Sequence, residues 1–432
     1  MQIDSILSGI VSTKHFFSVP LDYQQPEGEQ LSIFVREIVS TENQDLSLPY
    51  LVYFQGGPGF GAVRPVENSG WIKRALKEYR VLLLDQRGTG LSSLLNSATL
   101  AHLTAQEQAD YVCHFRADNI VRDAEVIRAQ LANNQPWSIL GQSFGGFCVL
   151  RYLSAAPQAL TEAFITGGIP SLTRQADDVY QATYKRVLAK NADFYHRFKD
   201  AESLTAELAD YIAENDVYLA TGEKLTVEML QLLGVNIGME QGPEAIYYLL
   251  EQAMIETAQG RTINPLFLHQ FSQFLDYNTN PIFALLHESI YCQQFHQQGA
   301  NWSAHRVREQ FPKFNYQQGQ RLLFTGEMIY PWFFEQFNQL KPLKEVAELI
   351  AQKSDWSNLY DVDVLLQNTV PVTAAIYSED MYVDMNYSLE TAQLVNNLSY
   401  WLTSEYEHNG IRMDGEHILD KLISLSRKDS IR

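Results

Sequence analysis

The chain has 432 residues, of which 46% are hydrophobic and 19% are charged. This composition is typical of a folded globular protein, and the length allows a large domain or a core that carries an inserted domain. The 32 Lys and Arg residues are outnumbered by 51 Asp and Glu residues, which gives a formal net charge of −19. This balance argues against nucleic acid as a partner, because phosphates require a basic surface.

The first 170 residues alternate strand-like and helix-like segments. Residues 118–132 have apolar residues at helical spacing. Short runs rich in apolar residues predict strands at 31–38, 48–54, 79–85 and 137–140 and at the start of 160–170. Near-continuous apolar strands separated by helices are typical of a mainly parallel sheet that is covered on both faces, so we expect an α/β fold.

Beyond residue 170 the pattern changes. Helical patterns rich in Tyr, Phe and Gln dominate to about residue 345, and a strand signal returns at 369–377 with a helical segment after it. We therefore predict an α/β core formed by residues 1–170 and 346–432, interrupted by a helical cap domain at 171–345.

The segment Gly141-Gln142-Ser143-Phe144-Gly145 follows a predicted strand and precedes a helical run. A serine in this context is typical of a nucleophile elbow, in which a sharp strand-to-helix turn exposes the hydroxyl. The glycines leave room for neighbouring backbone. A glycine-rich turn without chemistry is the alternative interpretation of this motif alone.

A second glycine-rich loop follows the strand at 48–54, in Gln55-Gly-Gly-Pro-Gly59. An acyl-transfer enzyme needs two backbone N–H groups aimed at a developing oxyanion. We expect them to come from Phe144, directly after the serine, and from Gly57, although a simple turn would also explain this loop. In the next motif, Asp85-Gln-Arg-Gly-Thr-Gly-Leu-Ser92, we expect Asp85 and Arg87 to tie loops together.

The three motifs GGPG, DQRGTGLS and GQSFGG, in this order and at these spacings, resemble those of the proline iminopeptidases (prolyl aminopeptidases) of the α/β-hydrolase superfamily. The resemblance extends over the whole chain and is to the longer branch, which has a large helical cap. It implies a serine peptidase that needs no cofactor or metal. Gln55 is a departure, since many members have His before GGPG.

The order of the triad in this fold is Ser, acid, His, so the base must follow the strand at 369–377. Only His408 and His417 do so. His417 directly precedes a helical run, as the family's histidine does, and is the predicted base that accepts the Ser143 proton. His408 lies in a polar turn and is the alternative.

The acid is expected just after the same strand, in Ser378-Glu-Asp-Met-Tyr382. The family has Asp-Met in the corresponding loop, and Asp380-Met381 matches it. Asp380 is therefore the predicted acid, with Glu379 and Asp384 as alternatives.

An aminopeptidase must hold a charged amine, and a desolvated amine needs a carboxylate. Glu288 and Glu327 lie in apolar, aromatic stretches of the predicted cap and resemble family segments whose glutamates bind the substrate's amine. Tyr330 is a candidate to pack on the proline ring. Purely structural roles are the alternative for all three residues.

The resemblance implies release of N-terminal proline from peptides through an acyl-enzyme. An aminopeptidase of broader or tripeptide specificity, an esterase of the same superfamily, and a non-catalytic binding protein are the alternatives. No HExxH motif or comparable cluster suggests a metal. The three cysteines form no CxxC pair, and no apolar run of about 18 residues suggests a membrane span. With no signal-peptide pattern at the N-terminus, we expect a cytoplasmic protein that binds no membrane. The oligomeric state is left open.

Overall fold

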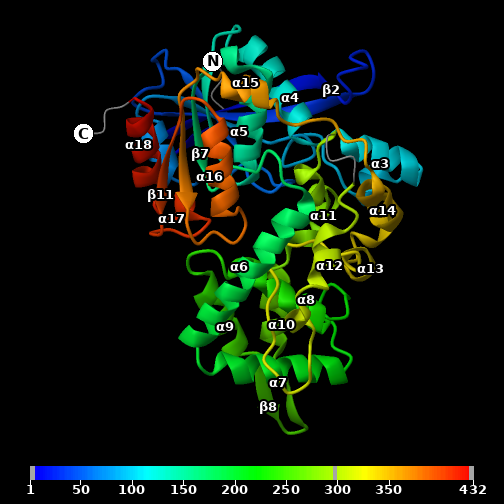
Figure 1. Ribbon diagram of the computed structural model, residues 1–432. Coiled ribbons are helices and arrows are strands. Elements are labelled where there is room, and N and C mark those ends of the chain that lie inside the picture. The colour runs from blue at the N-terminus through cyan, green and yellow to red at the C-terminus, as the bar shows by residue number, and fades with distance from the viewer. Residues whose placement is uncertain (1–4, 295–298, 428–432) are drawn as a thin grey trace.

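The computed structural model describes residues 5–294 and 299–427 (Figure 1). Its centre is a nine-stranded sheet with the order β1-β2-β3-β5-β4-β6-β7-β10-β11. The strands are β1 (Ser5–Leu7), β2 (Ile10–Pro20), β3 (Gln30–Ser40), β4 (Tyr50–Phe54), β5 (Arg80–Leu84), β6 (Trp137–Gln142), β7 (Leu160–Thr166), β10 (Val372–Tyr377) and β11 (Leu398–Thr403).

In this sheet β5, β4, β6, β7, β10 and β11 run parallel to one another. The pairs β1–β2, β2–β3 and β3–β5 are antiparallel. Every residue of β5, β6 and β10 is buried, as expected for parallel strands with both faces covered. Because parallel strands point the same way, the loops that follow β4, β6 and β10 meet at one edge of the sheet. Ser143, after β6, and Asp380, after β10, both lie at that edge.

Helices cover both faces of the sheet. In β4, Leu51 and Tyr53 pack with α1 (Gly70–Ala75) and α18 (Gly415–Ser426), whereas Val52 and Phe54 pack with α4 (Ala117–Leu131) and α5 (Phe144–Ala155). This alternation is the two-residue period of a strand buried on both sides. The remaining helices of this part are α2 (Ser97–Leu100), α3 (Ala105–Cys113), α15 (Val362–Leu366), α16 (Met385–Leu394) and α17 (Gly410–Met413). The predicted α/β architecture is confirmed.

A second, mainly helical part lies beyond the sheet (Figure 1). Its elements are α6 (Ala176–Arg197), α7 (Ala201–Glu214), α8 (Val227–Gln231), α9 (Gly242–Glu251), β8 (Met254–Thr257), β9 (Gly260–Ile263), α10 (Pro265–Gln273), α11 (Pro281–Leu286), α12 (Ser303–Arg308), α13 (Phe333–Gln336) and α14 (Lys344–Gln352). The predicted boundaries at 170 and 345 fall after β7 and at the start of α14. The division into domains stays a prediction.

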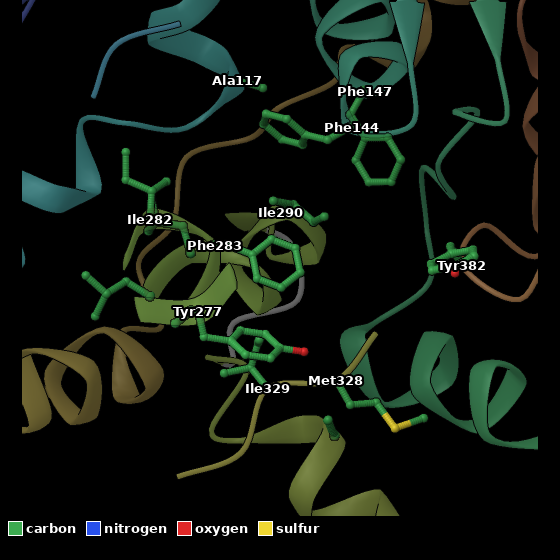
Figure 2. Packing of buried hydrophobic residues seen from close by; sticks show 14 of the residues in the cluster. Ala117, Phe144, Phe147, Tyr277, Ile282, Phe283, Ile290, Met328, Ile329 and Tyr382 are labelled. Atoms are coloured by element: carbon green, nitrogen blue, oxygen red, sulfur yellow. The ribbon is translucent and has the colours of Figure 1, made fainter. Parts of the chain in front are cut away.

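Apolar side chains join the two parts (Figure 2). Phe144 and Phe147 of α5 belong to the same buried cluster as Phe283 of α11. The ring of Phe283 lies 5.6 Å from that of Phe60 in the loop after β4. Among the described residues, no helix combines the length and the apolar character needed to cross a membrane.

Candidate active site

Ser143 occupies the turn between β6 and α5. Its φ of 54° and ψ of −126° lie outside the regions that most residues adopt. The flanking glycines are required by close backbone contacts. A methyl group at Gly145 would lie 2.0 Å from the carbonyl oxygen of Phe54, and one at Gly141 would lie 2.3 Å from that of Gly145. The turn therefore has the geometry of a nucleophile elbow.

The hydroxyl of Ser143 belongs to a buried hydrogen-bonded chain. The Nε2 atom of His408 lies 3.0 Å from Ser143 Oγ, and its Nδ1 atom lies 2.7 Å from Asp380 Oδ2. The relative exposures of Ser143, His408 and Asp380 are 8%, 4% and 2%. The structure thus brings together a hydroxyl, an imidazole and a carboxylate in the order of a serine-hydrolase relay.

Neighbouring groups hold the Asp380 carboxylate in place and determine the pKa of His408. The backbone N–H groups of Tyr382 and Val383 donate to Asp380 Oδ1, at 2.7 and 3.0 Å. Burial lowers the pKa of His408, but the Asp380 carboxylate and its hydrogen bond outweigh burial, and the pKa is raised overall. The imidazolium that forms when the serine gives up its proton is therefore stabilised.

The prediction that His417 supplies the base is wrong. His417 lies on α18, is exposed, and places its ring edge-on to Trp401 with centroids 5.8 Å apart. The reason is topological, because the loop after β11 opens at the same sheet edge as Ser143 and carries His408. A helix, α17, separates this loop from His417. The polar turn that contains His408 was the better candidate.

The predicted oxyanion donors belong to two segments that border Ser143. Phe144 is the first residue of α5, so its N–H has no partner within the helix. Gly57 has a φ of 139° and lines the cavity in front of Ser143. A methyl group at Gly56 would lie 2.9 Å from Ser143 Cβ, so this loop passes directly beside the serine. Their role as donors stays a prediction.

The DQRGTGLS motif ties loops together as expected. Asp85 accepts hydrogen bonds from the backbone N–H groups of Ala62, at 2.9 Å, and Leu91, at 2.8 Å. Arg87 is buried and pairs with Asp123 of α4. These contacts stabilise the loops that surround the site.

A cavity of about 660 Å³ lies in front of Ser143. Its lining includes His408 and, from the helical part, Tyr277, Phe283 and Glu327. The Glu327 side chain is 17% exposed and lies 3.8 Å from His287 Nε2. Burial raises the pKa of Glu327 to about 7, although His408 opposes the shift and Asp380 adds to it. The cavity therefore presents one carboxylate to a ligand bound at the serine.

Glu288 does not lie in this cavity, so its predicted contact with the substrate's amine is wrong. Its two carboxylate oxygens accept the backbone N–H groups of Ser303 and Ala304, at 2.9 and 2.8 Å, at the start of α12. Burial raises the pKa of Glu288 to about 7, against the effect of these two hydrogen bonds. Glu288 therefore provides acceptors for two backbone N–H groups that have no partner within α12.

Tyr330 is also outside the cavity, so its predicted contact with the proline ring is wrong. It is fully buried, with its hydroxyl 2.9 Å from that of Tyr184 and its ring stacked 5.7 Å from that of Trp332. The aromatic sequence around Glu327 reflects core packing of the helical part.

Sequence reasoning missed the aromatic residues that do line the cavity. The Tyr382 ring lies 4.3 Å from that of His408, and its hydroxyl donates to the carbonyl of Val235. Proximity to Asp380 was a usable signal for Tyr382. Tyr277 and Phe283 belong to no motif, and only the folding of the helical part brings them to Ser143.

A comparison with known protein families agrees with this geometry. A family model described as the alpha/beta hydrolase fold matches residues 49–218. Together with the parallel sheet, the elbow at Ser143 and the His408 relay, this match defines the chain as an α/β hydrolase.

Two relatives narrow the assignment further. A proline iminopeptidase of Aeromonas sobria is 53% identical over 423 residues, covering 98% of this chain and 98% of that protein. A proline iminopeptidase of Aspergillus aculeatus is 35% identical over 95% of this chain and 92% of that protein. The chain belongs to the proline iminopeptidase family.

A more distant similarity covers about half of the chain. A tripeptidyl aminopeptidase of Streptomyces coelicolor is 24% identical over 243 residues, which is 48% of this chain and 42% of that protein.

Proposed function

We propose that this chain is a serine aminopeptidase that releases N-terminal proline from peptides. The observation that carries the proposal is the Ser143–His408–Asp380 relay, which opens on a cavity containing Glu327. Membership of the proline iminopeptidase family supports the substrate class.

In this proposal His408 Nε2 accepts the Ser143 proton while Oγ attacks the carbonyl carbon of the first residue. The backbone N–H groups of Gly57 and Phe144 stabilise the oxyanion. His408 then protonates the departing amine of the shortened peptide. Water, activated by the same imidazole, hydrolyses the acyl-enzyme, releases proline and restores the Ser143 hydroxyl. Asp380 holds the imidazole in the required tautomer and stabilises its positive form.

Glu327 holds the substrate's charged amine. In the cavity a carboxylate that pairs with this amine both orients the scissile bond and excludes substrates whose N-terminus is blocked. As pH falls below about 7, the Glu327 carboxyl gains a proton and loses this attraction, because burial has raised its pKa to that value. Amine binding should therefore weaken on the acid side.

A direct test compares proline p-nitroanilide with its N-acetyl derivative. We expect cleavage of the free-amine substrate only. Replacing Glu327 by Gln should raise KM for this substrate about 10-fold, a loss of about 1.4 kcal/mol. The control is Glu335→Gln, since Glu335 is a 55% exposed carboxylate of the helical part. Equal cleavage of both substrates, or no effect of Glu327→Gln, would contradict the amine-binding role.

The similarity to a tripeptidyl aminopeptidase gives a second candidate, cleavage after three residues. A tripeptide p-nitroanilide added to the same assay, together with p-nitrophenyl acetate, distinguishes a tripeptidyl aminopeptidase and an esterase from the proposed activity.

The helical part at 171–345 acts in this proposal as the cap that covers the serine. A cytoplasmic location fits the three cysteines, which are all free thiols, because disulfides are rare in that compartment.

A further inference from the structure

The loop that carries His408 is held largely by the helical part. The backbone N–H of Glu407 donates to Glu240 Oε1 at 2.9 Å, and Glu240 N–H donates to Asn409 Oδ1 at 2.8 Å. The N–H of His408 itself donates to the carbonyl of Gly238, at 3.4 Å. The residues on both sides of the base therefore take their partners from the segment between α8 and α9.

A cation of the same part lies directly behind this loop. Lys190 of α6 forms an ion pair with Glu407, with Nζ 2.5 Å from Oε1. The side chains of Lys190 and Glu407 are 9% and 29% exposed, so the pair is shielded from solvent far more than an ordinary surface pair. One helical turn earlier, Arg186 pairs with Glu379 at 2.9 Å. The same face of α6 thus contacts the residue before each of His408 and Asp380.

The ion pair of Lys190 with Glu407 also affects the charge near His408. Asp380, Glu327 and Arg412 act on His408 directly. Glu407 lies next to it in the chain and is buried enough for its pKa to be raised, with Lys190 opposing that shift and Asp380 and Glu240 adding to it. Without the ammonium group, Glu407 would be left as a poorly compensated negative charge beside the relay.

We propose that Lys190 is a positioning residue, which holds His408 toward Ser143 through its ion pair with Glu407. The helical part then has two tasks, because it covers the cavity and also orients the base. This inference rests on the proposed function in assigning the base to His408, but it does not depend on specificity for proline.

The test is the pH dependence of the rate at which a fluorophosphonate labels Ser143, because this neutral probe needs no amine site. Labelling requires neutral His408, so its acid limb reports the pKa of that imidazole. Replacing Lys190 by Met removes a positive charge and stabilises the imidazolium. We expect the limb to move up by about 0.5 pH unit, and kcat for proline p-nitroanilide to fall about 10-fold with KM nearly unchanged. Lys190→Arg keeps the positive charge, so it should retain most of the wild-type acid limb and most of the wild-type kcat.

Glu407→Gln provides a second variant with the opposite sign. It removes a negative charge near His408, so the acid limb should move down. The matched control is Arg197→Met, which breaks the exposed pair between Arg197 of the same helix and Glu244 and should leave the limb unchanged.

The inference is overturned if Lys190→Met has the same acid limb and kcat as Arg197→Met, whatever happens to its melting temperature. If Lys190→Met does not fold, an unchanged limb in Glu407→Gln overturns it instead. Failure of the wild-type protein to release proline would contradict the proposed function and would leave this measurement on Ser143 intact.

Discussion

Ser143 keeps an unfavourable backbone conformation because its neighbours determine it from both sides. Its N–H donates to the carbonyl of Thr166 at 3.0 Å, and its own carbonyl accepts the N–H of Gly146 at 2.7 Å. A residue at such φ and ψ values costs about 1–3 kcal/mol. This strained conformation serves the site, because the turn presents the Ser143 hydroxyl to His408 and does not bury it in the first turn of α5.

The assignment of the base is tested by two single substitutions. His408→Ala removes the proton acceptor, so kcat for proline p-nitroanilide should fall about 10⁴-fold or more. His417→Ala removes an exposed ring on α18 and should change kcat by less than about 2-fold, a difference of about 0.4 kcal/mol. The reverse ranking of the two variants would contradict the assignment.

Ser143 and Asp380 could be found from the sequence because each follows a run of buried strand residues, Ser143 directly after β6 and Asp380 three residues after the end of β10. No such run precedes His408. Strand β11 lies at the edge of the sheet, and only its last residue, Thr403, is buried, so it has neither a buried run nor a clean alternation. Without that strand the two C-terminal histidines could be separated only by resemblance, which favoured the wrong one.

At the scale of single elements, α12 shows how a short buried helix of the helical part obtains acceptors for the N–H groups of its first turn. Its first residues, Ser303 and Ala304, are fully buried, and their N–H groups have the Glu288 carboxylate as acceptor. The glutamate itself lies in the short 3-10 helix Glu288–Tyr291. One side chain thus joins two segments and removes two unsatisfied donors from the core.

Replacing Glu288 by Ala should therefore affect stability more than substrate binding. Two buried N–H groups lose their acceptor, which should lower the free energy of unfolding by about 2–4 kcal/mol. KM for proline p-nitroanilide should change by less than about 2-fold, which corresponds to about 0.4 kcal/mol. Urea denaturation and steady-state kinetics on the same preparation provide the two values. A raised KM with unchanged stability would instead return Glu288 to the amine site.

The elements with strong periodicity were predictable. The strand signals at 31–38, 48–54, 79–85 and 137–140 correspond to β3, β4, β5 and β6, and that at 369–377 contains β10. The hairpin of β8 and β9 was not predicted, because each strand has only four residues and half of these residues are exposed, so neither strand gives a buried run. Packing within the helical part decides its conformation.

At the scale of the whole molecule, the site depends on three separate stretches of the chain. Ser143 comes from the first, Glu327 from the helical part, and Asp380 and His408 from the last. No local motif can specify how these stretches meet, and this explains why Glu288 and Glu327 looked equivalent in the sequence. One continuous buried cluster joins the sheet to the helical part (Figure 2), and its packing selects the glutamate that faces the serine.

The continuity of this cluster predicts that the helical part and the sheet unfold together. In urea, the loss of activity, which requires the contact between the helical part and the sheet, and the loss of far-UV circular dichroism should have coincident midpoints. Ile290→Ala tests the coupling, because Ile290 is 5% exposed at the junction and its truncation should cost about 2–5 kcal/mol. Both midpoints should fall together, since a cavity in a shared core weakens both parts. A separate early loss of activity, with the circular dichroism transition unmoved, would show that the helical part detaches from the sheet on its own.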